Sequence, residues 1–327
     1  MAFLARRLGF YVIAAWVAVT LNFFIPRAMP GNAVDTMLAK FPNLQPQARN
    51  ALVAEFGGGH QGSLLHQYGV YIGNILHLNL GISVSEYPDK VTSILASTIP
   101  WTLLLVGSAT VIAFVLGTVL GVFAAWRRGG ALDQALPVLM LLQATPYFFL
   151  ALLAIEFLSV DLHIFPISGG YALGIFQGWN WPFITSALYH SLLPALTIVV
   201  TSAAGWMLQM RNVMITTIGE DYVLAAQAKG LSSRRVVMTY AARNAILPNL
   251  SGFALSLGFV ISGALLMEIV FSYPGIGLTL FNAVTSDDYP LMQGIFLIIA
   301  LAVLVANLVA DAIYVLADPR ARAGRAG

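Results

Sequence analysis

The chain has no cysteine and few charged residues, and both shortages restrict what it can do. Without cysteine it can form no disulfide, thiolate nucleophile or cysteine-based metal site. Charged residues make up 9% of the chain and apolar residues 59%, against about 25% and roughly 45–50% in ordinary soluble domains. A composition this apolar is typical of an integral membrane protein, so we expect an all-α fold.

The sequence also lacks the short motifs that mark common enzyme sites. No G-x-x-x-x-G-K-S/T motif occurs, so the chain has no P-loop of its own for nucleotide phosphates. The histidines form no H-E-x-x-H pair, and no G-x-S-x-G nucleophile elbow is present. We therefore expect no catalytic residue, no metal site and no cofactor bound by this chain, with a membrane-embedded enzyme as a remote alternative.

Six apolar stretches are long enough to cross a bilayer, because a helix needs about 20 mainly apolar residues to span the hydrocarbon core. They lie near residues 8–28, 99–126, 134–158, 191–210, 248–270 and 290–316. The first stretch follows Arg6 and Arg7, as in a secretory signal, but its length and the missing small-residue cleavage site favour a retained helix.

Small residues and prolines within these stretches predict how the helices pack. The spacing of Gly117 and Gly121 lets two helices approach closely. Pro137 and Pro146 are expected to bend the third span, so that Gln143 and the neighbouring Thr145 line a cavity.

Positive charge orients the spans, because Lys and Arg accumulate in short cytoplasmic loops. With both termini in the cytoplasm, the only basic residues outside are Arg27, Lys40, Arg49 and Lys90. The net charge of +2 then reflects topology, and no DNA-reading motif supports a nucleic-acid partner. We predict a multi-pass protein of the plasma (inner) membrane.

A polar, basic segment at residues 220–248 interrupts the apolar stretches. Asp221 suits the positive end of a helix that continues through strong helix formers, and Gly230 can take the left-handed conformation that ends it. Ser232 is expected to cap a second helix, and Pro248 to be the first residue of the next span. The segment is therefore predicted to be helix, glycine turn and helix on the membrane surface.

The sequence of this segment resembles the cytoplasmic coupling loop of ABC importer permeases, and is most similar to the dipeptide/oligopeptide group. The matching residues read Asp-Tyr-Val-x-x-Ala-x-Ala-Lys-Gly-Leu-Ser at 221–232 and Arg-Asn-Ala-x-Leu-Pro at 243–248. Further matches extend along the chain, including Pro30-Gly31, Pro100-x-Thr102-Leu103, Pro274-Gly275-x-Gly277, Asp288-Tyr289-Pro290 and Asp318-Pro319-Arg320. The broader importer pattern begins Glu-Ala-Ala, and here Leu224 stands at the Glu position, which the peptide-type variant often lacks too.

This resemblance implies a type I ABC importer permease with six transmembrane helices, cytoplasmic coupling helices and a small extracytoplasmic domain after the first helix. The expected parts are a first helix at 1–30, an extracytoplasmic region at 31–92, a permease core at 93–317 with its coupling loop at 211–248, and a cytoplasmic tail at 318–327. The implied partners are a homologous second permease, two ATP-binding subunits that carry ATP and Mg, an extracytoplasmic substrate-binding protein and membrane lipid.

The residues expected to couple the chain to the ATPases lie in the coupling loop: Asp221, Tyr222, Ala225, Ala226, Lys229, Gly230, Arg234, Arg235, Arg243 and Pro248. Small alanines would let the first helix fit a groove on the partner, and the arginines would pair with its acids or with anionic lipid headgroups. Polar residues inside the spans are candidates for the pathway or for structural pairing, because such groups are costly in lipid. They are Gln143, Thr145, Glu268 and Asp311, and for Glu268 we favour structural pairing.

The cargo stays open at this point, because relatives of this kind carry short peptides, oligosaccharides or nickel complexes. Trp179 and Trp181, in an external segment, are interpreted as interfacial anchors, although aromatic rings also stack on sugars. Peptide is the preferred cargo and oligosaccharide the alternative. A secondary transporter is a more distant alternative. A proton relay needs acidic residues near the membrane midplane, whereas Glu268 and Asp311 lie near the ends of their predicted helices.

Overall fold

The computed structural model describes residues 2–28, 38, 45–47, 50, 63–260 and 265–317, with side chains described from residue 9 to residue 311 of these, except residue 26. Helices dominate this part of the chain, and its one β feature is an isolated antiparallel bridge between Ile82 and Lys90. Helices suit so apolar a chain, because each satisfies its own backbone hydrogen bonds. The predicted tail at 318–327 and most of the region 31–62 lie outside the described residues.

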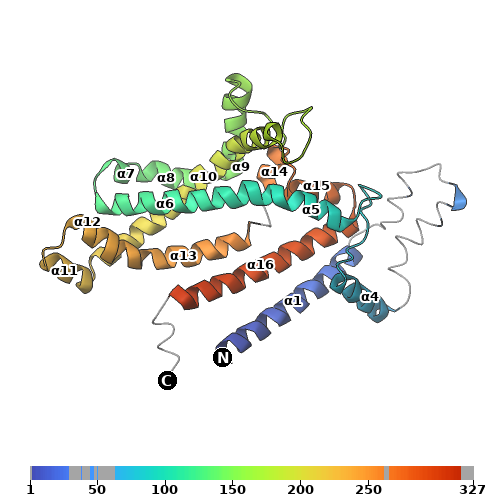
Figure 1. Cartoon of the computed structure of the whole chain (residues 1–327), viewed down its shortest axis with the longest axis horizontal. Coiled ribbons are helices and arrows are strands. Elements are labelled where there is room, and N and C mark those ends of the chain that lie inside the picture. Colours follow the sequence, from blue (N-terminus) through green and yellow to red (C-terminus); the bar gives the residue numbers. More distant parts are fainter. Residues whose placement is uncertain are drawn as a thin grey trace. The chain divides into compact units, whose positions relative to one another are not determined.

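Two compact units divide the chain: residues 1–101 with 275–304, and residues 102–274 with 305–327 (Figure 1). The helices of the first unit are α1 (Ala2–Ala28), α4 (Leu64–Leu76), α5 (Val91–Thr102), α15 (Ile276–Thr285) and the start of α16 (Tyr289–Ala317). Asn22 on α1 donates to the backbone oxygen of Gln293 at 2.9 Å, and the side chain of Gln293 donates to the backbone oxygen of Asn22 at 3.0 Å. This reciprocal pair holds α1 to α16.

Asp288 fixes the loop before α5 to the start of α16. Its carboxylate is fully buried and accepts hydrogen bonds from Ser83 Oγ, from Ser85 N at 2.8 Å and from Ser85 Oγ at 2.6 Å. The other carboxylate oxygen accepts from Leu291 N at 3.1 Å, so Asp288 also caps the first turn of α16.

The second unit contains most of the remaining helices. They are the π-helical turn η2 (Leu103–Gly107), α6 (Ser108–Trp126), α7 (Ala131–Gln134), α8 (Leu136–Ala144), α9 (Tyr147–Ala154), η3 (Ile155–Asp161), α10 (Trp181–Ile218), α11 (Asp221–Ala228), α12 (Ser233–Arg235), η4 (Val236–Ala242), α13 (Arg243–Gly258) and α14 (Leu265–Val270).

Helices α6 and α10 pack closely along their length, and two glycines make the approach feasible. A Cβ atom at Gly117 would lie 2.5 Å from the backbone oxygen of Ala203 and 2.6 Å from Cβ of Trp206. One turn on, a Cβ at Gly121 would lie 2.6 Å from the backbone oxygen of Met207. The close packing predicted from the glycine spacing is confirmed.

Three described helices are long and apolar enough to cross a membrane: Val91–Trp126, Trp181–Ile218 and Tyr289–Asp311. The pair Leu136–Ala144 and Tyr147–Asp161 is bent by 98° and makes a fourth if it is taken as one span. Shorter apolar helices cover Gly9–Ile25 and Ile276–Thr285. The chain is therefore a helical protein with the composition and helix lengths of a membrane protein.

Several predicted helix limits are corrected by the structure. The fourth span begins at Trp181, earlier than predicted, because Asn180 caps it by accepting a hydrogen bond from Phe183 N at 2.9 Å. Pro194 lies inside this helix. Pro137 does not bend the third span, because it occupies the first turn of α8, where a proline costs no hydrogen bond. The break instead follows Thr145, with Pro146 preceding α9.

The helix in the predicted fifth span also begins earlier than predicted. The chain is helical without interruption from Ser233 to Gly258, so Pro248 lies inside α13 and the prediction that it opens the span is wrong. A proline inside a helix removes one backbone hydrogen bond, which the bonds of the flanking turns can outweigh. The predicted second surface helix and the first part of the predicted fifth span, up to Gly258, are therefore one continuous helix.

Candidate functional site

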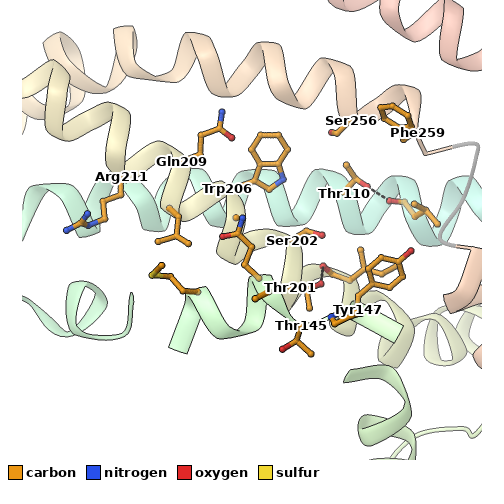
Figure 2. Close-up of a pocket in the computed structure, with 18 of the residues that line it drawn as sticks. Thr110, Thr145, Tyr147, Thr201, Ser202, Trp206, Gln209, Arg211, Ser256 and Phe259 are labelled. Carbon is orange, nitrogen blue, oxygen red and sulfur yellow. Dashed lines mark hydrogen bonds between the residues drawn. The ribbon is translucent and has the colours of Figure 1, made fainter. Parts of the chain in front are cut away.

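A cavity of about 1250 Å³ opens beside the broken third span (Figure 2). Its walls come from α6, α8, α10 and the end of α13, and the turn at Thr145 and Pro146 forms part of its edge. Gln143 and Thr145 both line it, as predicted from the sequence. The kink matters because it leaves space against α10 that a straight third helix would fill.

Most hydroxyl groups in the cavity wall are already bonded to their own helices. Thr110 donates to Val106 O at 2.6 Å, and Thr145 donates to Leu141 O at 2.8 Å. Thr201 and Ser256 bond backbone oxygens of their own helices in the same way, at 2.9 Å and 2.7 Å. These side chains therefore present mainly methyl or methylene groups to the cavity.

Arg211 lines the cavity with its positive charge already compensated. Its Nε donates to Asp133 Oδ1 at 2.7 Å, and a second guanidinium nitrogen lies 2.6 Å from the same oxygen. Asp133 Oδ2 accepts from the backbone N–H of Gly129 at 2.9 Å, where Gly129 has a φ of 76°. That N–H and the Arg211 guanidinium lower the pKa of Asp133, so the carboxylate stays ionised.

Aromatic rings join the helices behind the cavity. Phe114 on α6 stacks on Phe253 of α13 with ring centroids 4.2 Å apart, and it meets Trp206 of α10 edge to face at 5.3 Å. Trp206 itself lines the cavity. Because aromatic pairs prefer such defined geometries, these contacts hold α6, α10 and α13 at fixed spacing.

The acids predicted inside the spans lie elsewhere. Glu268 is fully buried and accepts a hydrogen bond from Thr102 Oγ1 at 2.7 Å, which fits structural pairing. Asp311 is partly buried on α16, and neither acid is among the residues that line the cavity. No group of three or more histidines or acids suited to a metal ion occurs among the described residues.

The coupling segment forms the predicted helix, glycine turn and helix. Glu220 precedes α11 in extended conformation, Asp221 lies in its first turn, and Gly230 follows it with a φ of 75°. Ser232 also has an extended backbone before α12, without a capping bond from its hydroxyl to a described residue. The predicted left-handed stop at Gly230 is confirmed.

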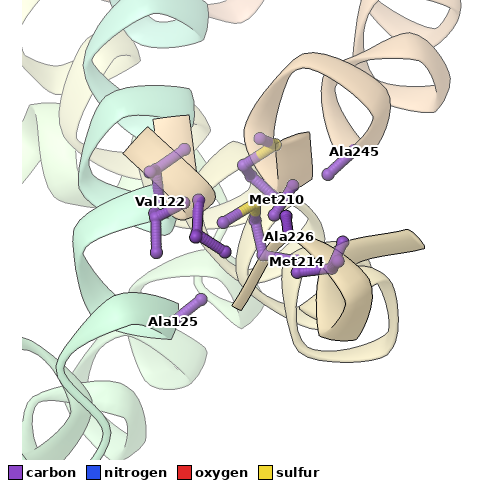
Figure 3. Packing of buried hydrophobic residues seen from close by; sticks show 10 residues of the cluster. Val122, Ala125, Met210, Met214, Ala226 and Ala245 are labelled. Carbon is purple, nitrogen blue, oxygen red and sulfur yellow. The ribbon is translucent and has the colours of Figure 1, made fainter. Parts of the chain in front are cut away.

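Helix α11 has one face packed into the chain and one face exposed. Its inner face joins a buried apolar group that we call the coupling core (Figure 3). The coupling core consists of Val122, Ala125, Met210, Met214, Val223, Ala226, Val236, Val237, Ala241 and Ala245. It ties α11 to the ends of α6 and α10 and to the helix that begins at Ser233.

The predicted docking residues divide between these two faces. Ala226 is 3% exposed and packs in the coupling core, so it does not lie on the outer face. Tyr222 is 41% exposed, and Ala225 and Lys229 are exposed beside it. The spacing of Val223 and Ala226, three residues apart, is the sequence signal that could have assigned Ala226 to the inner face.

The basic residues of the segment are also exposed. Arg234 and Arg235 on α12 and Arg243 at the start of α13 lie at the surface. Next to them, Trp126 at the end of α6 donates from its indole N–H to Ser233 Oγ at 3.2 Å. The outer surface of α11 and α12 thus combines a tyrosine, small residues and several cations.

Sequence reasoning missed several cavity residues. The pair of Arg211 and Asp133, 78 positions apart, gave no local signal. Ser202, Trp206 and Gln209 recur on α10 at spacings of four and three, which place them on one helix face toward the cavity. The shared helix face could be predicted from that spacing. The sequence alone does not show whether such a face lies against another helix or lines a cavity.

The sequence of the chain matches a known family and several known transport proteins. Residues 117–323 match the family described as "Binding-protein-dependent transport system inner membrane component". The chain is 34% identical to the Di/tripeptide transport system permease protein DppB of Pseudomonas aeruginosa, over 98% of this chain and 99% of the relative. It is 32% identical to the Dipeptide transport system permease protein DppB of Escherichia coli, over 98% and 99% of the two chains. It is 30% identical to the Oligopeptide transport system permease protein AppB of Bacillus subtilis, over 92% of each chain. The chain therefore belongs to the family of binding-protein-dependent transport system inner membrane components.

Proposed function

We propose that this chain is the transmembrane permease subunit of an ATP-driven importer of dipeptides and oligopeptides, and that it forms half of the translocation pathway. The observation that carries this proposal is the link between α11 and the cavity. Met210 and Met214 of α10 lie in the coupling core, and Arg211 between them lines the cavity. A displacement of α11 therefore acts directly on the helix that forms the cavity wall.

The coupling step follows from the two faces of α11. The outer residues Tyr222, Ala225 and Lys229 dock on an ATPase subunit, while the inner residues hold the helix to the coupling core. When the ATPases close around ATP, α11 and the helix from Ser233 move together, and the permease pair shifts between inward-open and outward-open states. Arg234, Arg235 and Arg243 pair with acids of the ATPase or with lipid headgroups.

The proposed assembly has two permeases, this chain and a homologous second one, and two ATP-binding subunits that hold ATP and Mg. Six spans cross the inner membrane with both termini in the cytoplasm, and residues 93–317 form the permease core. The extracytoplasmic region at 31–92 receives the substrate-binding protein. This topology is supported by the apolar helices Gly9–Ile25, Val91–Trp126, Trp181–Ile218 and Tyr289–Asp311 and by the distribution of Lys and Arg.

Short peptides are the cargo that the relatives support, since all three carry the word peptide in their names. An oligosaccharide is the second candidate, because Trp179, just before α10, is 101% exposed and Trp181, the first residue of α10, is 75% exposed. If these rings only anchor the protein, replacing both with leucine lowers uptake of every cargo alike. A selective loss of cello-oligosaccharide uptake, with insertion unchanged, favours the sugar.

The docking proposal is tested by co-purification. We expect the membrane complex to contain ATPase subunits and the isolated chain to hydrolyse no ATP. Tyr222→Ala should reduce recovery of the ATPase severalfold, whereas Tyr87→Ala, a tyrosine 48% exposed in the loop before α5, should not. Equal recovery with both variants would remove Tyr222 from the docking surface.

A further inference from the structure

Three polar side chains of the cavity wall lie on or against one face of α10. Gln143, Ser202 and Gln209 line the cavity, and none of them hydrogen-bonds to another residue within the described part of the chain. The hydroxyls of Thr110, Thr201 and their neighbours are by contrast bonded to their own helices. Figure 2 shows Ser202 and Gln209 on the cavity side of α10.

These three groups lie in a row along α10. Ser202 and Gln209 are two helical turns apart, or about 10 Å along the axis. Gly205 lies between them, and the side-chain nitrogen of Gln143 is 3.4 Å from the point that a Cβ at Gly205 would occupy. The missing side chain at Gly205 thus lets the Gln143 amide lie against α10 between the other two groups.

The cavity wall carries no uncompensated charge among its described residues. Arg211 is its one ionised side chain, and Asp133 holds that guanidinium through contacts of 2.7 Å and 2.6 Å. What remains for a molecule in the cavity is the primary amides of Gln143, Gln209 and Asn212, the hydroxyls of Ser202 and Tyr147, and the ring of Trp206. This set can hydrogen-bond neutral groups and has no means of selecting a charge.

We propose that Gln143, Ser202 and Gln209 form a contact strip for the backbone of a peptide in transit, one that is indifferent to the charge of its side chains. A primary amide offers a donor and an acceptor, as a peptide group does. The row of about 10 Å matches about three residues of extended peptide, at roughly 3.3 Å per residue. The inference rests on the proposed transport function and adds the way in which the pathway contacts its cargo.

The strip explains how one pathway passes many peptides. Contacts to the backbone are common to all of them, and each hydrogen bond is weak enough for the cargo to leave, as conduction through any pore requires. Selection by sequence or charge then falls to the substrate-binding protein. Loss of one such contact should reduce kcat/KM for uptake about 3- to 10-fold, the effect of one neutral hydrogen bond.

The first test compares two serines in the reconstituted complex. Ser202→Ala removes a free hydroxyl of the strip, whereas Ser251→Ala removes a hydroxyl on α13 that is bonded to Leu247 O at 3.1 Å and does not line the cavity. We expect Ser202→Ala to lower kcat/KM about 3- to 10-fold for trialanine, Ala-Glu-Ala and Ala-Lys-Ala alike. Equal uptake by both variants would overturn the inference.

A second test introduces charge into the strip. Gln143→Glu should reduce the ratio of Ala-Glu-Ala to Ala-Lys-Ala uptake about 10-fold relative to the parent complex, while Gln143→Leu lowers both equally. An unchanged ratio in Gln143→Glu contradicts contact with cargo. If the parent complex takes up cello-oligosaccharide rather than any peptide, the peptide function fails, and if no cargo enters at all, the transport function itself fails.

Discussion

Replacing Gly117 with alanine should force apart the two most closely packed helices of the second unit. The added Cβ would lie 2.5 Å from Ala203 O and 2.6 Å from Trp206 Cβ, where ordinary contacts begin at 3.4 Å. The nearest atom belongs to the backbone, so no side-chain rotation relieves the clash. Overpacking costs about 1–3 kcal/mol, and this contact falls at the upper end of that range.

A matched glycine separates this clash from the general effect of alanine on helices. Gly69 lies in α4 with no atom within 4 Å of its virtual Cβ, so Gly69→Ala only gains helix propensity, about 1 kcal/mol. Both variants share that gain, and the difference between them is the packing cost of about 3 kcal/mol. Thermal unfolding of the detergent-solubilised protein at one scan rate should place Gly117→Ala roughly 4 °C below Gly69→Ala. Equal midpoints would refute the close packing of α6 on α10.

Three further changes test other parts of the structure. Gly230→Val should abolish most ATP-coupled uptake while the protein still inserts, because Gly230 has a φ of 75°. Gly230→Asn should retain more uptake, since asparagine tolerates this conformation. Uptake equal to that of the parent protein in both variants would show that the turn has no part in coupling. Met214→Ala should lower the unfolding free energy by about 2–5 kcal/mol, measured by denaturant titration, because Met214 is fully buried in the coupling core; a loss under about 1 kcal/mol would contradict that packing. Asp133 has a lowered pKa, so its stabilising contribution is complete above its ordinary value of 3.8 and is lost as the pH falls through the folded-state pKa. Asp133→Asn should therefore flatten this acid limb of the stability profile, and an unchanged limb would exclude the Asp133 carboxylate, bonded to Gly129 N–H and to Arg211, as its cause.

The coupling segment was predictable from sequence because its signals are local. The glycine at 230 and the acidic residue at 221 act within one helical turn, and both have the predicted roles in the structure. Proline signals were less reliable, since Pro137 lies in the first turn of α8 without bending it and Pro248 lies inside a helix that neighbouring turns stabilise. A proline marks a weak point in a helix, and the surrounding packing decides whether the helix ends there.

The cavity was only partly predictable, because its walls are assembled from distant segments. Gln143 and Thr145 were found through the neighbouring proline, a local signal. The salt bridge of Arg211 with Asp133 depends on how the turn after α6 folds back on α10, which no local pattern encodes. Likewise Ala226 was expected to dock because it is small, and the packing of α11 shows that it faces inward together with Val223.

The unbroken helix from Ser233 to Gly258 determines where this permease can be divided in a chimera. A graft that exchanges the coupling loop and ends at Pro248 would join foreign and native residues in mid-helix, where the register of every buried side chain depends on both sides. The helices end at the turns of Gly219 and Gly230, so these turns are suitable boundaries for a chimera. A chimera cut at these two turns exchanges α11 alone, whereas one that also changes Arg234 and Arg235 must carry the whole helix up to Gly258 with it.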